Sequence, residues 1–227
     1  MTVEVSVIMS VYNDQSNVSS SIKSILDQTF KNFEFLILDD NSTDSTFEKI
    51  KKFEEQDDRI KVFRNIENEG LTKSLNTLLR NASSKLIARQ DSDDISLPDR
   101  LQLQVNEMKT NNYDAIYTRA INKQNKKKIP GISYYIPSKI LIKYKNPFIH
   151  GTLMIKKEVI KSLNYYEEAF YYAQDYKLAW ELYKNNYKIR NLNKALYVLN
   201  TKNNLSEKFR NEQNYYANCI RKQINPN

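Results

Sequence analysis

The first half of the chain alternates between short apolar runs rich in β-branched residues and segments with apolar residues at helical spacing. The apolar runs cover residues 3–12, 33–38, 60–63 and 85–88, and each precedes a segment in which apolar residues recur every three or four positions. A fifth run, at 114–118, completes the series. This repeated order predicts an α/β fold with a mostly parallel central sheet, flanked by helices and joined by right-handed crossovers.

Two acidic clusters follow directly after predicted strands. Asp39 and Asp40 end the second strand, and Asp91, Asp93 and Asp94 come just after the fourth. In open α/β sheets, ligands bind outside the carboxyl ends of the strands. The position of both clusters therefore predicts a functional site at that edge of the sheet.

Short polar side chains stand where the predicted helices begin. We expect Asp14 to cap the first helix and Ser42 or Thr43 to cap the second. Pro98 suits the first turn of a helix, so the fourth helix is expected to start at residues 98–100.

The pattern changes after about residue 118. A polar, basic loop at 122–131 is followed by a strand-like piece at 152–155, a helical stretch at 175–182 and an alternating stretch at 188–200 that could pair at a sheet edge. The last segment places four apolar side chains near one helical face, namely Leu205, Phe209, Tyr216 and Ile220. We therefore divide the chain at 1–118, 119–200 and 201–227.

The composition is basic, with 35 Lys and Arg against 27 Asp and Glu and a net charge of +8. This balance suits an anionic partner such as a membrane surface or a phosphorylated substrate, and a lysine-rich solvated surface is the alternative. We expect no nucleic acid partner, because no aromatic–basic recognition module is evident.

A single cysteine, Cys219, excludes an intramolecular disulfide and fits a reducing, cytoplasmic compartment. We expect neither a signal peptide nor a membrane-spanning segment.

The acidic cluster at 91–94 has two interpretations. Carboxylates this close raise one another's pKa unless a cation neutralises them, and oxygen ligands are those that Mg²⁺ and Mn²⁺ prefer. The alternative is a solvated loop in which Asp93 or Asp94 caps the next helix. An EF-hand is excluded, because its sixth and twelfth positions would be Ser96 and Gln102. Glycine-rich phosphate loops and a zinc site are also excluded, with three glycines, one Cys and one His.

Six stretches in series carry a resemblance. They are VSVIMSVYN, LILDDNSTDST, NEGLTKSLN, LIARQDSDDISLPDRL, IHGTLMIKKEVI and YAQDYKLAWEL. From about residue 3 to 185, in this order, they resemble the inverting glycosyltransferases of family 2, which have the GT-A fold. The resemblance implies a nucleotide-sugar-binding half at 1–118, an acceptor-binding half at 119–200 with the catalytic base, and a basic C-terminal helix or tail at 201–227.

The resemblance implies that several residues contact the nucleotide. They are Val11, Tyr12, Asn13, Asp40, Gly70, Lys73, Asp91 and Ser92. Asp40 would accept the imide N–H of uracil, which favours a uridine nucleotide, and Lys73 would lie near the diphosphate. Asp91 and Asp93 form the family's DxD motif, with Asp93 as the ligand of Mn²⁺ or Mg²⁺ and Asp94 as a second candidate. Arg89 would contact a phosphate or pair with Asp91 or Asp99.

An inverting transfer also needs a general base for the acceptor hydroxyl. The family typically supplies it in a Glu-Asp pair, and this chain has Gln174-Asp175, so Asp175 is the expected base and Gln174 departs from the pattern. Glu167 and Glu168 are the alternatives. His150 is expected to contact the diphosphate or line the acceptor site, or else to be structural.

We therefore expect a metal-dependent inverting glycosyltransferase that moves a sugar from a nucleoside diphosphate, UDP above all, to a glycan acceptor. Such families commonly build bacterial capsule, lipooligosaccharide or O-antigen. The alternatives are a non-catalytic member of the same fold that binds a nucleotide or glycan, and a nucleotidyltransferase. The basic tail suggests docking to the inner face of the cytoplasmic membrane, where a lipid-linked acceptor resides; a packing or dimer helix is the alternative.

Overall fold

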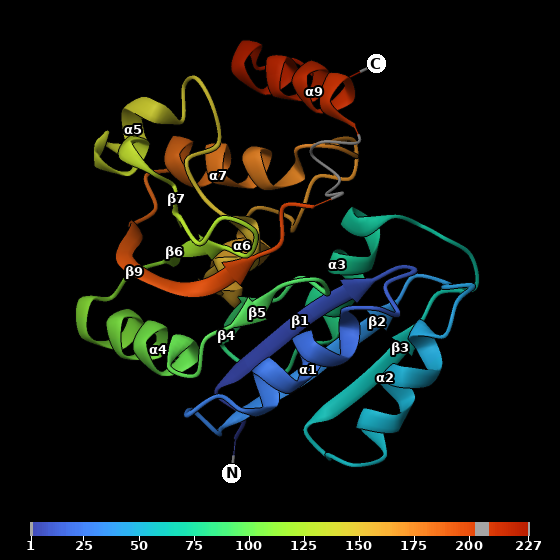
Figure 1. The fold of residues 1–227 in the computed structure, drawn as a ribbon. Coiled ribbons are helices and arrows are strands. Elements are labelled where there is room, and N and C mark those ends of the chain that lie inside the picture. The colour runs from blue at the N-terminus through green and yellow to red at the C-terminus, as the bar shows by residue number, and fades with distance from the viewer. Residues whose placement is uncertain (1, 203–208, 227) are drawn as a thin grey trace.

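The computed structural model describes residues 2–202 and 209–226 (Figure 1). In chain order, the elements are β1 (Val5–Val11), α1 (Val18–Leu26), β2 (Phe33–Asp39), α2 (Thr46–Glu54), β3 (Ile60–Arg64), α3 (Leu71–Asn81), β4 (Leu86–Arg89), β5 (Ile95–Ser96), α4 (Arg100–Asn111), β6 (Ala115–Asn122), β7 (Lys128–Ile129), η1 (Ile132–Tyr135), α5 (Ser138–Leu141), η2 (His150–Thr152), β8 (Met154–Lys156), α6 (Lys157–Ser162), α7 (Gln174–Lys184), β9 (Ile189–Leu199) and α9 (Arg210–Lys222).

One sheet runs through both halves of the chain, in the order β3-β2-β1-β4-β8-β6-β9-β5, with β7 paired to β6. The first four strands of this order are parallel, as the strand–helix alternation predicts. β8 is antiparallel to both β4 and β6, so β6 continues the parallel direction but is separated from β4 by one strand. The stretch at 188–200 forms β9, which lies between β6 and the two-residue β5 instead of at the edge.

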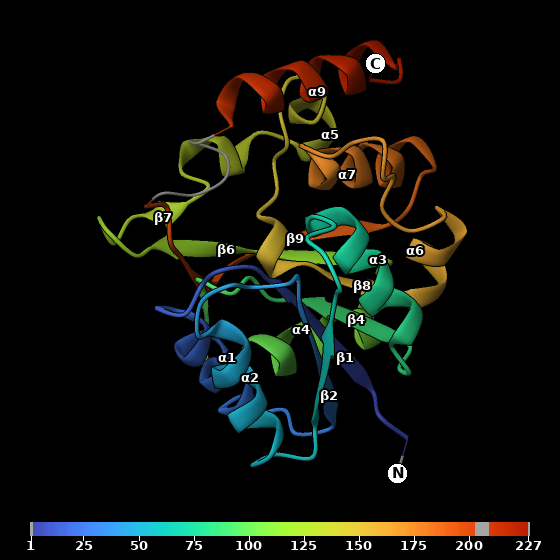
Figure 2. The same ribbon diagram turned by 90° about the vertical axis from the view of Figure 1, so that its right-hand side faces the viewer.

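The core forms two layers, one on each face of the sheet (Figure 2). Val5, Val7, Met9 and Val11 face the layer that α1, α2 and α4 cover. Ile8, between them, faces the opposite layer, which α3, α6 and α7 cover. β1 and β2 are buried on both faces, which explains why both read as nearly continuous apolar runs.

Two of the expected helix caps are wrong. α1 has Asn17 at its N-cap, and Asp14 instead accepts a hydrogen bond from the Ser92 hydroxyl at 2.7 Å. α2 begins at Thr46, after Ser45, and Ser42 accepts the backbone N–H of Asn13 at 2.9 Å. In both cases the short polar side chain accepts a hydrogen bond from a different loop instead of capping the helix that follows it. The expected start of the fourth helix is confirmed, because α4 begins at Arg100.

Helix α9 packs against α7 at the top of the molecule in Figure 1. Cys219 and Ile220 are buried in the core, and Tyr216 makes ring contacts with Phe170 and Tyr172. The apolar face of this helix is therefore used for internal packing, which was the alternative to membrane docking. Leu205, from the same expected face, lies outside the described residues. Along 2–202 and 209–226, no helix combines the length and apolar character that crossing a bilayer requires.

Candidate active site

The acidic stretch 91–94 forms the loop between β4 and β5, and the side chain of Gln90 forms hydrogen bonds with its backbone. The buried Gln90 amide donates to the backbone oxygens of Asp91 and Asp94, both at 3.0 Å, and to the Ser21 hydroxyl at 2.9 Å. Its carbonyl accepts the Ser96 hydroxyl at 2.7 Å. One buried side chain therefore bonds both ends of the acidic turn.

Asp91 is held on three sides. One carboxylate oxygen pairs with the guanidinium of Arg89, whose side chain is fully buried. The Asp91 backbone N–H donates to the Tyr197 hydroxyl at 3.0 Å. The other carboxylate oxygen lies against Gly151, where a Cβ would be only 2.6 Å away. The expected pairing of Arg89 with Asp91 is confirmed. The guanidinium of Arg89 thus has its partner within the protein.

Asp93 and Asp94 differ in their surroundings. Asp93 is half-buried, and its carboxylate accepts a long hydrogen bond of 3.3 Å from the Asn200 side chain. Burial, reinforced by the charges of Asp91 and Asp14, raises the pKa of Asp93 to about 6. Asp94 is only 2% exposed and accepts the Asn200 backbone N–H at 2.6 Å. Burial and the neighbouring acids raise its pKa well above the usual range.

The donor set of this loop fits a hard divalent cation. It offers carboxylate oxygens whose pKa values are raised first by burial and then by neighbouring negative charge, and a bound cation would offset both effects. Within residues 2–202 and 209–226, no three acidic, histidine or cysteine side chains are arranged to hold a metal ion by themselves. Mg²⁺ in proteins is commonly bound by one or two carboxylates together with substrate phosphates.

The end of β1 lies beside the end of β2, because Val11 pairs with Asp39, and β1 is also paired to β4, where Ile8 pairs with Arg89 just before the acidic loop. The Val11 carbonyl accepts the Asp40 backbone N–H at 2.8 Å, and the Asn13 side chain accepts that of Thr43 at 2.8 Å. The Tyr12 side chain is half exposed. The predicted nucleotide contacts at 11–13 and the loop carrying Ser92, which is tied to Asp14, thus meet at one edge of the sheet.

Asp40 is buried and both of its carboxylate oxygens are engaged. One accepts the Asn65 amide at 2.7 Å and the Glu69 backbone N–H at 2.9 Å. The other accepts the Gly70 backbone N–H at 2.8 Å. Asp40 therefore fixes the loop between β3 and α3, a role that the sequence did not indicate.

Gly70 occupies a position that only glycine suits. Its φ of 87° is left-handed, and a Cβ there would lie 2.7 Å from the Tyr171 ring. Tyr171, which is 48% exposed, thus lies over the start of α3, where Lys73 is exposed one turn later. Lys73 is on the same edge of the sheet as the acidic loop.

Asp175 lies in the first turn of α7, after Ala173 in the left-handed conformation. Its carboxylate accepts the Asn146 amide at 2.7 Å. Burial raises its pKa, and hydrogen bonds only partly oppose this shift. The charge of Asp91 adds to the increase. Gln174 is buried beside it.

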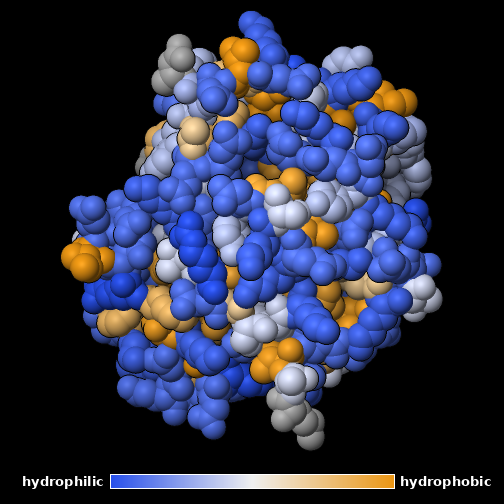
Figure 3. Space-filling model, turned by 180° about the vertical axis from the view of Figure 1, so that it is seen from behind, coloured by the Kyte–Doolittle hydropathy of each residue, from blue (hydrophilic) through white to orange (hydrophobic). Residues whose placement is uncertain are grey.

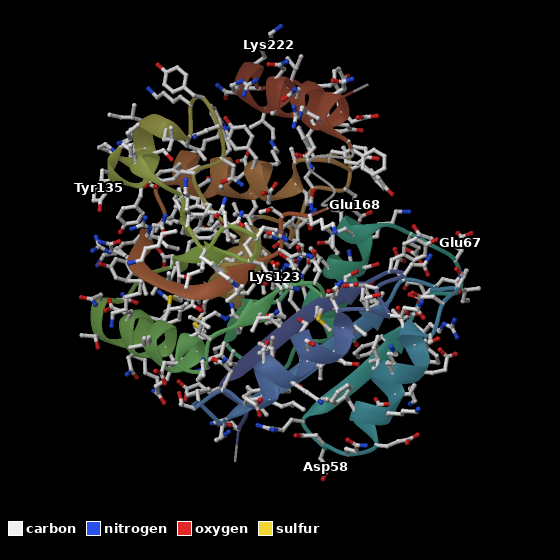
Figure 4. The ribbon with its side chains drawn as sticks, viewed as in Figure 1. Asp58, Glu67, Lys123, Tyr135, Glu168 and Lys222 are labelled. Carbon is white, nitrogen blue, oxygen red and sulfur yellow. The ribbon has the colours of Figure 1, made fainter. Side chains whose placement is uncertain are left out.

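The alternative bases are engaged elsewhere. Glu167 pairs with Lys177 at 3.2 Å. Glu168 accepts the Asn76 amide at 3.0 Å and lies beside α3 (Figure 4). Both glutamates are exposed, so neither has the buried environment that raises the pKa of Asp175.

His150 is bonded to Tyr166, with its Nε2 2.7 Å from the tyrosine hydroxyl. Burial lowers the pKa of His150 well below its usual range, and the charge of Arg89 lowers it further. The imidazole is therefore neutral at physiological pH and brings no positive charge to a diphosphate.

Several residues of the site escaped the sequence analysis. They are Asp14, Gln90, Asn146, Gly151, Tyr166, Tyr171, Tyr197 and Asn200. Each acts through a contact between distant parts of the chain; Tyr197, for example, is 106 residues from Asp91. Only the scarcity of glycine could have drawn attention to Gly151.

Comparison with known proteins places this geometry in a family. The model of the family described as "Glycosyl transferase family 2" matches residues 6–163. EpsE from Bacillus subtilis (strain 168) is 33% identical over 199 residues, which are 86% of this chain and 72% of EpsE. The Escherichia coli UDP-Glc:alpha-D-GlcNAc-diphosphoundecaprenol beta-1,3-glucosyltransferase WfgD is 42% identical over 113 residues, half of this chain and 44% of WfgD.

Solved structures share the fold at lower identity. The S. aureus TarS 1-349 structure in complex with UDP has a TM-score of 0.78 at 22% identity, covering 96% of this chain and 64% of TarS 1-349. The mannosyltransferase PcManGT from Pyrobaculum calidifontis, in complex with GDP-Man and Mn²⁺, has a TM-score of 0.79 at 20% identity. The match covers 98% of this chain and 66% of the PcManGT chain. This chain thus spans less than two thirds of WfgD and of these solved chains. The predicted GT-A fold is confirmed, and the chain belongs to glycosyl transferase family 2.

Proposed function

We propose that the chain transfers a sugar, with inversion, from a UDP-sugar to a glycan acceptor in polysaccharide synthesis. One observation carries the proposal: the segment 146–151 contacts Asp175, a partly buried acid with a raised pKa, through Asn146, and Asp91 of the acidic loop through Gly151. A metal-dependent inverting transfer needs a cation to neutralise the leaving diphosphate and a base to accept the proton of the acceptor hydroxyl. The acidic loop can bind the cation, and Asp175 can act as the base.

For the donor, the UDP of the TarS complex and the UDP-Glc in the name of WfgD support a uridine nucleotide. The GDP-Man of PcManGT makes a guanosine donor the alternative. The 11–13 backbone, Tyr12 and the loop fixed by Asp40 and Gly70 would hold the base and ribose. In this arrangement Asp40 acts by shaping the loop, since both its oxygens are engaged.

For the metal, Asp93 is the proposed ligand, and Asp91 would hold the ribose or a metal-bound water. When bound, Mn²⁺ or Mg²⁺ neutralises charge on the diphosphate oxygens as the nucleotide leaves. Asp94, buried against Asn200, serves to anchor the loop to the end of β9. Lys73 would add positive charge on the phosphate side.

In the transfer step, Asp175 accepts the proton of the acceptor hydroxyl while that oxygen attacks the anomeric carbon. The bond from this carbon to the diphosphate oxygen breaks as the new bond forms on the opposite face, which inverts the configuration. The raised pKa brings Asp175 closer to working pH, where a base is most effective. Asn146 orients the carboxylate by its 2.7 Å hydrogen bond.

The test is turnover of UDP-sugars with Mn²⁺ by the wild type and by Asp93→Asn and Asp175→Asn. Glu167→Gln is the matched control, because it removes an acid near α7 that is exposed and paired with Lys177. We expect both aspartate variants to lose transfer and the control to keep it. Undiminished transfer by both aspartate variants would refute the proposal. Binding of UDP by the wild type without any hydrolysis or transfer would instead indicate the non-catalytic member of the fold.

A further inference from the structure

The positive charge of the protein is concentrated in one part of the chain. Between Asp114 and Glu158 there are ten basic residues, Arg119 and nine lysines, and no acidic residue. The rest of the chain has 25 basic and 27 acidic residues, a net charge of −2. Residues 115–157 carry a net charge of +10, whereas the C-terminal tail, 201–227, carries only +3.

The same part of the chain carries unusual exposed apolar side chains. The described residues include ten exposed large hydrophobic side chains, and five of these lie in residues 132–145, which we name the docking segment. They are Ile132 (88% exposed), Tyr135 (72%), Ile136 (44%), Ile140 (53%) and Tyr144 (69%). By contrast, the face seen in Figure 3 is mostly hydrophilic, with apolar atoms in small scattered groups.

The docking segment is held firmly against the protein. Leu141 and Ile142 are buried, and the Ile142 carbonyl accepts the Tyr176 hydroxyl at 2.6 Å. The Arg221 guanidinium, from the end of α9, donates to the Tyr144 carbonyl at 2.8 Å. The apolar side chains that point outward are thus displayed on a fixed platform. Figure 4 shows Tyr135 at the outer edge and Lys222 at the top of the upper half, whereas Asp58 lies at the opposite end.

We propose that the docking segment binds the surface of an anionic phospholipid membrane. Isoleucine side chains can enter the boundary between headgroups and acyl chains, and tyrosines favour the headgroup level. Lys139, Lys143 and Lys145 alternate with these side chains and are exposed, so they would meet lipid phosphates. Each lysine close to such a surface contributes roughly fivefold to the membrane partition coefficient.

The composition favours lipid over a protein partner. The cores of protein interfaces are depleted in lysine, because burying an ammonium group is costly. In the docking segment three exposed lysines lie among five exposed apolar side chains, an arrangement that lets the charges stay at the phosphates while the apolar groups insert. A second copy of the chain would also bring a like-charged surface against this one, which opposes self-association.

Docking would place the acceptor side of the proposed site close to the membrane. The segment ends next to Asn146, whose amide bonds Asp175 at 2.7 Å. Tyr176, the next residue of α7, bonds the segment itself. An acceptor carried on a lipid would therefore reach Asp175 from the docked face. This consequence depends on the proposed transferase activity, whereas the membrane contact itself does not.

The experiment is vesicle sedimentation with the full chain, without donor or acceptor. Vesicles of phosphatidylcholine alone are compared with vesicles of phosphatidylcholine and phosphatidylglycerol. One variant carries Lys139→Gln, Lys143→Gln and Lys145→Gln. A second carries Tyr135→Ser and Ile140→Ser. The matched control carries Lys31→Gln, Lys52→Gln and Lys85→Gln, which remove three exposed lysines from the first half of the chain. Circular dichroism and thermal unfolding verify that all variants fold.

We expect the wild type to bind the anionic vesicles, and the lysine variant to bind them on the order of a hundredfold more weakly. The serine variant should also lose binding, and the control should lose little. Absent binding by the wild type, or equal losses in the lysine variant and its control, would overturn the proposal. So would a dimer in solution that the serine variant disrupts without any vesicle binding. Because no turnover is measured, these outcomes are independent of whether the transferase proposal holds.

Discussion

Gly151 allows a sharp test of how the acidic loop is held. An alanine Cβ at this position would lie 2.4 Å from the Tyr197 hydroxyl oxygen and 2.6 Å from an Asp91 carboxylate oxygen, whereas ordinary contacts begin near 3.4 Å. The two atoms would have to move by about 1.0 and 0.8 Å. Tyr197 is fully buried and accepts the Asp91 backbone N–H, so it cannot swing aside without disturbing the same loop.

The expected cost follows from these shifts. Overpacking of this kind costs about 1–3 kcal/mol of folding free energy. For a chain of this size each kcal/mol lowers the melting temperature by roughly 2–4 °C, so Gly151→Ala should lower it by roughly 2–12 °C. A displacement near 1 Å in a binding site can reduce turnover about a hundredfold. We therefore expect both a lower melting temperature and a loss of UDP-sugar turnover well beyond the effect of partial unfolding.

The assay combines thermal unfolding with turnover at a temperature where every variant is folded. Gly131→Ala is the matched control, because a Cβ there would meet no atom within 4 Å, and it should change stability by less than about 1 kcal/mol. Adding Tyr197→Phe to Gly151→Ala should recover only part of the stability, since the ring carbon Cζ still lies 2.8 Å from the new Cβ. Equal stability and turnover in Gly151→Ala and Gly131→Ala would refute the close packing of Asp91.

Three further predictions concern single acids. Asp175→Asn should reduce kcat by about 10²–10⁴ while leaving UDP binding unchanged, and wild-type kcat should decline as pH falls through the raised pKa of Asp175; a pH–rate profile shared by both proteins would contradict this. Asp93→Asn should weaken the binding of Mn²⁺ at least about tenfold. The measurement is the increase in melting temperature when Mn²⁺ is added to the protein with UDP, and the control Asp99→Asn should leave that increase unchanged. Burial alone would raise the pKa of Glu34, but hydrogen bonds from Lys61 and two serines hold it at about 2. The stability that Glu34 contributes is present above pH 4.5 and lost as pH falls towards 2. Glu34→Gln should therefore cost about 3 kcal/mol of folding free energy at neutral pH, and this deficit should shrink as the pH is lowered towards 2.

The sheet could be predicted because its strands are buried on both faces. Residues 33–39 are all buried, and five of the seven are apolar, so β2 appears in the sequence as a nearly continuous apolar run interrupted only by Glu34 before it ends at Asp39. The same reasoning could not place β8 between β4 and β6. Strand order depends on which segments meet in space, and the three residues of β8 carry no signal for a partner.

The helix caps show the limit of local rules. Asp14 and Ser42 are the residue types that cap helices, and each does accept or donate a hydrogen bond. Their partners, Ser92 and Asn13, lie 78 and 29 residues away. A short polar side chain near a helix start can satisfy a neighbouring loop equally well, and only the fold decides between the two.

The acids of the site were found from the sequence, but their roles depend on what each one contacts. Asp40 has both oxygens engaged by the loop before α3, and Asp94 is buried against Asn200. Among the described residues, the side-chain partner of Asp93 is Asn200 at a long 3.3 Å, so Asp93 is held less tightly than Asp40 and Asp94 and is more available for a cation. Asp175 differs from them in its contact with Asn146 and in its place at the start of α7, on what we propose to be the acceptor side. Because acids of one chemical type differ here only in their partners, Asn200→Ala should affect Asp93 and Asp94 differently. It removes the side chain that contacts Asp93 and keeps the backbone N–H that Asp94 accepts, so it should alter cation binding by Asp93 without releasing Asp94.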